Sequence, residues 1–248
     1  MSGDYRQIIE RLEPKVASRR LQDVEAQQRW LGEEAARRAW ESTPEGIAHI
    51  AAERKRLEEA AWRTEAPLLG VPPRLMKASF DCKDRWQTAA LARAKRYVED
   101  GEIDEGAALI LAGNTGCGKS SAAAAILRLR GRQSRSRFWS FSDLATTLLL
   151  EARRGEDETL RAAKTVDLAV FDDFGMEYLK PDGLFWTFLD AIIWTREAHY
   201  KATVVTTNST IDDLKTRYSD RIISRFLGDW GRVCEVPDRD LRQQRVEV

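Results

Sequence analysis

The 248 residues of the chain are enough for one sizeable domain and a smaller region, and the composition, 43% hydrophobic and 32% charged, is that of a globular protein. Lys plus Arg and Asp plus Glu each number 40, so any affinity for nucleic acid must come from a local patch and not from net charge. The three cysteines lie far apart and there are two histidines, which excludes a zinc site with close ligand spacing. Unpaired thiols, a polar N-terminus and short apolar runs predict a cytoplasmic protein without a membrane segment.

Residues 1–66 are predicted to form a helical N-terminal region. The stretch is rich in Glu, Arg, Ala and Gln, with apolar residues at helical intervals, which indicates two or three helices. Thr43 and Pro44 mark a fresh helix start, because a capping hydroxyl precedes a proline at the first helical position. Three tryptophans of this region either anchor a partner or pack the region against itself and the rest of the chain: Trp30, Trp40 and Trp62.

Residues 67–73 contain three prolines and a glycine and break the helical pattern. We predict that they form a linker to a second domain of residues 74–248. This domain is expected to begin with a turn at residues 79–81 and a helix over residues 86–98.

Residues 113–120 have the spacing G-x-x-x-x-G-K-[ST] of a phosphate-binding loop, between a predicted strand at 107–112 and a helix that starts at Lys119. The glycines let backbone N–H groups converge on phosphates, and the helix adds its positive end. Lys119 is predicted to neutralise the β- and γ-phosphates, and Ser120 to offer its hydroxyl to Mg²⁺. The alternative is a glycine turn that only joins strand to helix. The predicted nucleotide ligands are Gly113, Asn114, Thr115, Gly116, Cys117, Gly118, Lys119, Ser120 and Ser121.

Four more strands are predicted after this loop, and segments of helical length separate them. The strands are 137–141, 167–171, 202–207 and 232–236, and the helices are 142–153, 184–198 and 220–227. This alternation predicts an α/β domain with a parallel sheet and helices on both faces. Ligands of such sheets bind beyond the carboxyl ends of the strands.

Two carboxylates, Asp172 and Asp173, end the third of these predicted strands. A buried strand end is unfavourable for two like charges unless a cation binds there. We predict that Asp172 holds Mg²⁺ and that Asp173 orients and deprotonates an attacking water. The alternative is an Asp pair that caps a turn. Asn208 ends the next strand and either contacts the γ-phosphate or the water, or is an ordinary turn residue.

Two groups of arginines have both a functional and a structural interpretation. Arg221 and Arg225 are spaced as neighbours on one helix face, which usually means a solvated edge, but Arg225 could reach the γ-phosphate of a second subunit. The arginine-rich residues 128–137, with Phe138 and Trp139 beside them, could contact single-stranded DNA or form a solvated connection.

Together these residues resemble a family. The loop 113–120, the Asp172–Asp173 pair, residues 206–208 and the pair Arg221 and Arg225 occur in the order of the Walker A, Walker B, sensor 1 and arginine-finger motifs of AAA+ ATPases. Within that group, residues 74–242 most resemble DnaC-type replicative helicase loaders and next the IstB-type ATPases that assist transposition.

The resemblance implies a P-loop AAA+ domain with a five-stranded parallel sheet, preceded by the helical N-terminal region. It implies ATP and Mg²⁺ bound between neighbouring subunits, Arg225 acting in trans, and Arg242 as a second sensor. It also implies that the ATPase domain binds single-stranded DNA and that the N-terminal helices bind a DnaB-type replicative helicase. Asp173 stands where the family usually has Glu, so slow or partner-stimulated hydrolysis is expected.

Three functions follow as hypotheses. The first is an ATP-dependent loader that places the replicative helicase on single-stranded DNA. The second is an IstB-like ATPase that binds DNA and regulates a transposase; its chemistry would be the same, so residues 1–66 must separate the two. The third is a nucleotide-gated interaction module with negligible hydrolysis, for which Asp173 is the sequence signal.

Overall fold

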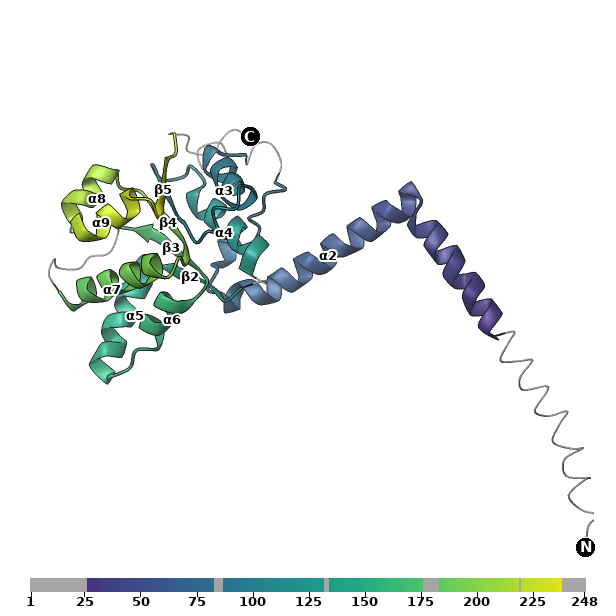
Figure 1. The fold of residues 1–248 in the computed structure, drawn as a ribbon, viewed down its shortest axis with the longest axis horizontal. Coiled ribbons are helices and arrows are strands. Elements are labelled where there is room, and N and C mark those ends of the chain that lie inside the picture. Colours follow the sequence, from purple (N-terminus) through teal and green to yellow (C-terminus); the bar gives the residue numbers. More distant parts are fainter. Residues whose placement is uncertain (1–25, 83–86, 132–133, 176–182, 219, 238–248) are drawn as a thin grey trace, which may run out of the picture. The chain divides into compact units, whose positions relative to one another are not determined.

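The computed structural model describes residues 26–82, 87–131, 134–175, 183–218 and 220–237 (Figure 1). The chain divides into two compact units, the first ending at Ala61 and the second beginning at Trp62. Helix α2 (Pro44–Leu68) belongs to both units, so this division falls a few residues before the predicted boundary at residues 66–67. The helix also includes Pro67, and the predicted linker therefore starts in its last turn.

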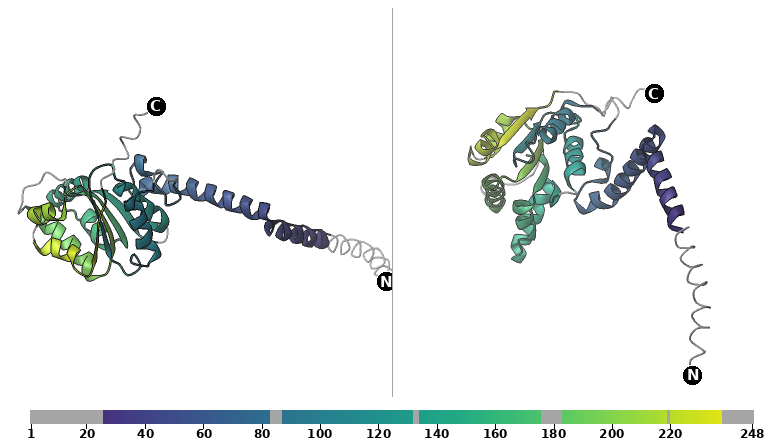
Figure 2. Two further views of the ribbon diagram at one scale, coloured as in Figure 1. Left: turned by 90° about the horizontal axis from the view of Figure 1, so that it is seen from above. Right: turned by 45° about the vertical axis from the view of Figure 1, so that its right-hand side comes forward.

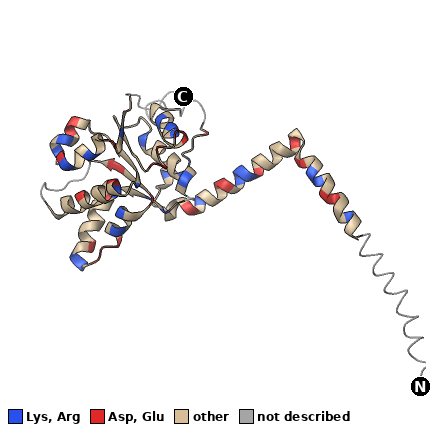
Figure 3. Cartoon of the chain, viewed as in Figure 1, with Lys and Arg blue, Asp and Glu red and all other residues tan. Residues whose placement is uncertain are grey.

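The first unit is helical in its described part, over residues 26–41 and the beginning of α2. As predicted, α2 starts at Pro44 under a threonine cap: the Gly46 N–H donates to the Thr43 hydroxyl at 3.1 Å. Positive and negative residues are interspersed along α2 (Figure 3). Several large apolar residues of this unit are exposed: Trp30, Leu31, Trp40, Ile47, Ile50 and Leu57.

The second unit contains a parallel sheet. The strands in its described residues are β1 (Ala108–Ala112), β2 (Ser136–Ser140), β3 (Leu168–Phe174), β4 (Ala202–Thr207) and β5 (Gly231–Glu235). They pair in the order β2-β3-β4-β1-β5, each neighbour parallel to the next. The predicted five-stranded parallel sheet is confirmed.

Helices precede β1 and connect the strands, as the alternating pattern predicts. They are η1 (Pro73–Leu75), a short 3₁₀ helix, then α3 (Ala89–Glu99), α4 (Lys119–Arg130), α5 (Phe141–Arg154), α6 (Glu158–Thr165), α7 (Leu184–Ala198), α8 (Ile211–Arg217) and α9 (Asp220–Leu227). Helix α3 starts later than predicted, because the Thr88 hydroxyl caps it by accepting the Leu91 N–H at 3.0 Å. None of the helices in the described ranges is long and apolar enough to span a membrane.

Each face of the sheet carries its own hydrophobic core, since successive residues of a strand point to opposite faces. Leu109 and Leu111 of β1 pack with α3 and α4, whereas Ala108 and Ile110 pack with helices α5, α6, α7 and α9. Figure 2 shows the strands between these two helical layers. Burial on both faces explains why β1 reads as a continuous apolar run.

Trp62 packs into the second unit, where its side chain is 3% exposed. Its indole N–H donates to the Met76 carbonyl at 2.8 Å. Of the two interpretations of the N-terminal tryptophans, packing against the main domain therefore applies to Trp62. Trp30 and Trp40 are exposed and remain free to contact a partner.

Arg196 fixes the position of β4 from α7. Its guanidinium is fully buried, donating to the Thr203 hydroxyl at 2.8 Å and to the Ala163, Val166 and Ala202 carbonyls at 3.0, 2.9 and 2.6 Å. Burial lowers the pKa of Arg196 to about 9. The strand that carries the polar residues of the site is thus held by a buried hydrogen-bond network.

Candidate functional site

The loop between β1 and α4 has the conformation that the motif predicts. Gly118 has φ +92°, and a Cβ there would lie 2.9 Å from the Thr88 hydroxyl oxygen, so both conformation and space require glycine. The Gly113 N–H donates to the Thr207 carbonyl at 3.2 Å, which fixes the start of the loop to the end of β4. Lys119 is the first residue of α4.

The Lys119 ammonium lies inside this loop and is 5% exposed. Its Nζ donates to the Gly113 carbonyl at 2.6 Å, the Asn114 carbonyl at 2.7 Å and the Asn208 Oδ1 at 2.9 Å. Three acceptors match the three N–H groups of an ammonium. A phosphate that binds Lys119 must therefore replace at least one of these bonds.

Strand β3 continues past its predicted end at residue 171 and contains a bulge. Phe171 pairs with Val205 and Phe174 with Thr207, so both aspartates lie opposite the one residue between these partners, Thr206. Asp173 has φ +59°, in the left-handed region that aspartate tolerates better than most residues. A bulge of this kind redirects side chains, and here Asp173 lines a cavity whereas Asp172 is 2% exposed.

A continuous set of hydrogen bonds connects Lys119 to both aspartates. The Asn208 amide donates to Asp173 Oδ1 at 3.3 Å while its Oδ1 accepts from Lys119. The Thr206 hydroxyl accepts the Asp173 N–H at 3.0 Å and donates to Asp172 Oδ1 at 2.6 Å. Asn208 therefore connects Lys119 and Asp173 within the candidate site. Thr206 was not predicted as a site residue, although it lies in the sensor 1 segment.

Asp172 and Ser120 have the chemistry of a Mg²⁺ site. Burial raises the pKa of Asp172, and hydrogen bonds with the Thr206 and Ser120 hydroxyls oppose that rise. A buried carboxylate beside a hydroxyl offers the hard oxygen ligands that Mg²⁺ prefers. In the described ranges no three His, Cys, Asp or Glu side chains cluster as metal ligands, so a bound Mg²⁺ would also need oxygens from phosphate or water.

A cavity of about 880 Å³ opens at this loop. Its size is in the range of small-molecule and cofactor sites. The predicted residues that line it are Thr115, Gly116, Gly118, Lys119, Ser120, Ser121, Asp173 and Asn208. The residues that sequence reasoning missed are Arg74, Leu75, Lys77, Ala78, Ser79, Cys82, Thr88 and Leu91.

The remaining loop residues shape the site without lining the cavity. Gly113 and Asn114 present their carbonyls to Lys119. Cys117 is buried, and its thiol donates to the Asn114 carbonyl at 3.0 Å. These three residues hold the loop closed around the lysine.

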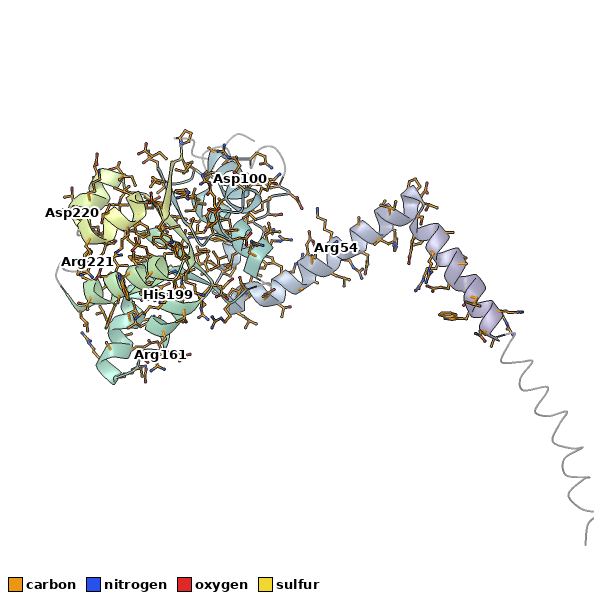
Figure 4. All side chains as sticks on the ribbon, viewed as in Figure 1. Arg54, Asp100, Arg161, His199, Asp220 and Arg221 are labelled. Atoms are coloured by element: carbon orange, nitrogen blue, oxygen red, sulfur yellow. The ribbon has the colours of Figure 1, made fainter. Side chains whose placement is uncertain are left out.

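Arg225 does not line the cavity of its own chain. It forms an ion pair with Glu197 of α7, and its Nε is buried without a hydrogen-bond partner in the described part of the chain. Arg221, labelled in Figure 4, is more exposed and pairs with Asp190 at 3.3 Å. Arg242, the predicted second sensor, lies outside the described residues.

The described arginines of the segment 128–137 contact other parts of the fold, and Arg132 lies outside the described residues. Arg128 donates to the Ala78 carbonyl at 3.5 Å, Arg130 pairs with Asp104 and Arg135 pairs with Asp167 at 3.5 Å. Phe138 is buried, and Trp139 stacks on Phe171 at 5.7 Å between ring centroids. These contacts favour the structural interpretation of the segment.

A family model described as "IstB-like ATP binding protein" matches residues 87–232, well over half of the chain. No curated protein matches at a significant level. Among solved structures, the DnaC helicase loader is 24% identical with a TM-score of 0.58, and the match covers 67% of this chain and 100% of that one. DnaI is 22% identical with a TM-score of 0.56, covering 67% and 95%.

The AMPPCP-bound DnaA from Aquifex aeolicus is 22% identical with a TM-score of 0.57; the match covers 67% of this chain and 52% of DnaA. The chain thus corresponds to about half of DnaA. At these identities the three solved structures establish the fold, which is the predicted one.

Proposed function

Because the chain belongs to the IstB-like ATP-binding proteins, we propose that it is an AAA+ ATPase that binds and hydrolyses ATP in the cavity beside Lys119. The observation that supports hydrolysis most directly is the connection Lys119–Asn208–Asp173. It puts a cation for phosphate, a neutral amide and a carboxylate side by side at the carboxyl ends of neighbouring strands. These are the groups that phosphoryl transfer to water requires.

In this proposal Lys119 and the loop N–H groups bind the β- and γ-phosphates. Asp173 accepts a proton from water as the water oxygen attacks the γ-phosphorus, and the bond to the ADP oxygen breaks. Asn208 and Thr206 hold Asp173 in place through its Oδ1 and its N–H. Ser120 and Asp172 would hold Mg²⁺, which would neutralise charge on the phosphates.

Self-association is part of the proposal, with Arg225 reaching the γ-phosphate in a neighbouring protomer. Arg225 is half-buried, carries a buried Nε without a partner, and is paired with Glu197 in its own chain. On assembly, phosphate would replace Glu197 as its partner. Because Glu197 competes for the arginine, we expect a smaller contribution than an unopposed arginine finger makes.

Mixing two impaired variants tests the trans role. Arg225→Ala is expected to lower turnover by about tenfold, and Asp173→Asn removes the proposed base. In a mixture, an Asp173→Asn protomer supplies Arg225 to the ATP site of a neighbouring Arg225→Ala protomer, which retains Asp173. This site is then complete, so phosphate release by the mixture should exceed that of either variant alone. A mixture that releases phosphate no faster than the average of its components contradicts the trans role.

The first candidate for the biological role is loading of the replicative helicase onto single-stranded DNA. We propose that residues 1–66 bind the DnaB-type helicase, residues 67–73 link the two parts, and residues 74–248 form the ATPase domain that binds DNA. The exposed Trp30 and Trp40 support a partner-binding role for the first unit, because aromatic residues often dominate binding energy. The cytoplasmic location remains a prediction.

The second candidate is regulation of a transposase, the role that the resemblance to IstB-type ATPases implies; the family match is compatible with it. Both roles can be tested with the full chain as bait, an ATP analogue, and the purified replicative helicase and transposase of the same source. If the first role is correct, the wild type retains helicase, and the Trp30→Ala/Trp40→Ala variant retains at least about tenfold less. Retention of transposase alone would favour the second role, and retention of neither would contradict both.

A further inference from the structure

One wall of the cavity comes from the segment between α2 and α3, which carries no recognised motif. Arg74 and Lys77 of this segment line the cavity together with Lys119. Among the described residues, the charged side chains of the lining are these three cations and one carboxylate, Asp173. An excess of positive charge at a cavity favours an anionic ligand.

The segment that presents Arg74 is held by backbone constraints. The Leu69 carbonyl accepts the Phe138 N–H at 2.7 Å, which ties the start of the segment to β2. Pro72 and Pro73 fix their own φ angles before Arg74. Leu75, the next residue, is buried in the core beneath α4. Arg74 is therefore presented from a fixed turn and not from a loose loop.

Trp62 fixes the other side of the same turn. Its buried indole N–H donates to the Met76 carbonyl at 2.8 Å, and Met76 lies between the two cavity-lining cations Arg74 and Lys77. A buried indole N–H needs an acceptor, so this bond couples the position of the turn to the last turns of α2. Arg128 adds a weaker contact to the Ala78 carbonyl at 3.5 Å.

Arg74 is exposed and lines the cavity. Partly buried arginines of the second unit are instead paired within the protein, as Arg93 with Glu102 at 2.6 Å and Arg225 with Glu197. Across the described ranges, the Arg74 side chain has neither an ion pair nor a hydrogen bond, although its charge favours the ionised carboxylate of the buried Asp172. A guanidinium presented at a cavity without a hydrogen-bond partner is available to a ligand, and its planar fork suits phosphate oxygens.

We propose that Arg74 binds the phosphates of ATP in cis as a further cation of the nucleotide site, and that Trp62 is a positioning residue that holds Arg74 toward the cavity. The inference depends on the proposed ATP binding and adds to it a phosphate ligand from the start of the ATPase domain. Arg74 would act from the same chain as Lys119, in contrast to Arg225.

Inorganic tripolyphosphate, which has the phosphates but neither base nor ribose, is the probe that isolates this contact. Its inhibition constant is measured by competition with a fluorescent ADP analogue. Arg74→Ala should raise that constant about tenfold or more, since one charge-assisted contact is lost. Arg74→Lys should recover part of the loss, and Arg153→Ala, at an exposed arginine of α5, should leave the constant unchanged.

Trp62→Phe tests the positioning role, because phenylalanine keeps the aromatic packing but cannot donate to Met76. We expect a rise of a few-fold in the tripolyphosphate constant in the wild-type background and none in the Arg74→Ala background. Trp30→Phe, at an exposed tryptophan, is the matched control. Melting temperatures show whether each variant is folded at the assay temperature. An equal effect of Trp62→Phe in both backgrounds would overturn the positioning role.

The remaining outcomes separate this inference from the proposed function. If Arg74→Ala leaves the tripolyphosphate constant unchanged while Lys119→Ala loses nucleotide, the phosphate contact is refuted but the ATP site stands. If Arg74→Ala weakens ATP but not tripolyphosphate, Arg74 contacts base or ribose and the inference is overturned. If the wild type binds no nucleotide, the proposed function itself fails.

Discussion

Lys119→Ala is expected to abolish ATP binding in practice, raising the dissociation constant for a non-hydrolysable ATP analogue by at least about 100-fold. The variant loses the buried cation that, in the proposed site, would make charge-assisted bonds to phosphate, each worth about 1.5–3 kcal/mol. It also loses the three contacts that hold the loop to Asn208 and to the carbonyls of Gly113 and Asn114. Isothermal titration calorimetry in the presence of Mg²⁺ measures the constant directly.

The matched control is Lys95→Ala, at an exposed lysine of α3 whose partner is Glu99, one turn along the same helix, at 3.5 Å. It should bind the analogue as the wild type does. Thermal melting distinguishes lost binding from lost folding in the Lys119 variant. Wild-type affinity in a folded Lys119→Ala protein would show that the nucleotide binds elsewhere.

Asp173→Asn is expected to lower ATP turnover by about 10³-fold while the affinity for ATP is kept. Asparagine tolerates the positive φ of this position and can still accept the amide bond from Asn208, so the bulge is retained. The substitution removes the carboxylate that we propose takes the proton of the attacking water, and such groups contribute about 10²–10⁴-fold. Phosphate release in a single turnover, with nucleotide binding measured in parallel, separates the two effects.

Asp229→Asn, at an exposed aspartate before β5, is the control for loss of a negative charge. Turnover by Asp173→Asn at the wild-type rate would mean that another group accepts the proton. Negligible turnover by the wild type, with or without single-stranded DNA, would instead support the nucleotide-gated module without catalysis.

The parts of the fold that the sequence predicts are those encoded by contiguous patterns. β1 is a short apolar run, β4 is rich in β-branched residues, and the alanine-rich stretch after Lys119 has no helix breaker until Gly131, so their positions are confirmed closely. Helices α6 and α8 are short and were not predicted. For α8 a signal was present, since Thr210 and Asp213 have the spacing of a capping box and form one.

The parts of the site that could not be predicted depend on contacts between distant segments. The bulge at Asp173 exists only because β3 and β4 pair with a register shift. Arg74 reaches the cavity because Trp62 and the core hold its turn, and neither residue belongs to a motif with fixed spacing. The pairing of Arg225 with Glu197 likewise joins residues 28 positions apart on two packed helices.

The Arg225–Glu197 pair has a consequence for the energetics of self-association. An isolated chain already neutralises this arginine, so each contact formed with a neighbour's phosphate exchanges one ionic interaction for another and adds little net binding energy. Subunits joined through such an exchange should separate readily once the γ-phosphate has left. The lifetime of the assembly would then depend on which nucleotide is bound, and not only on the affinity between the protein surfaces.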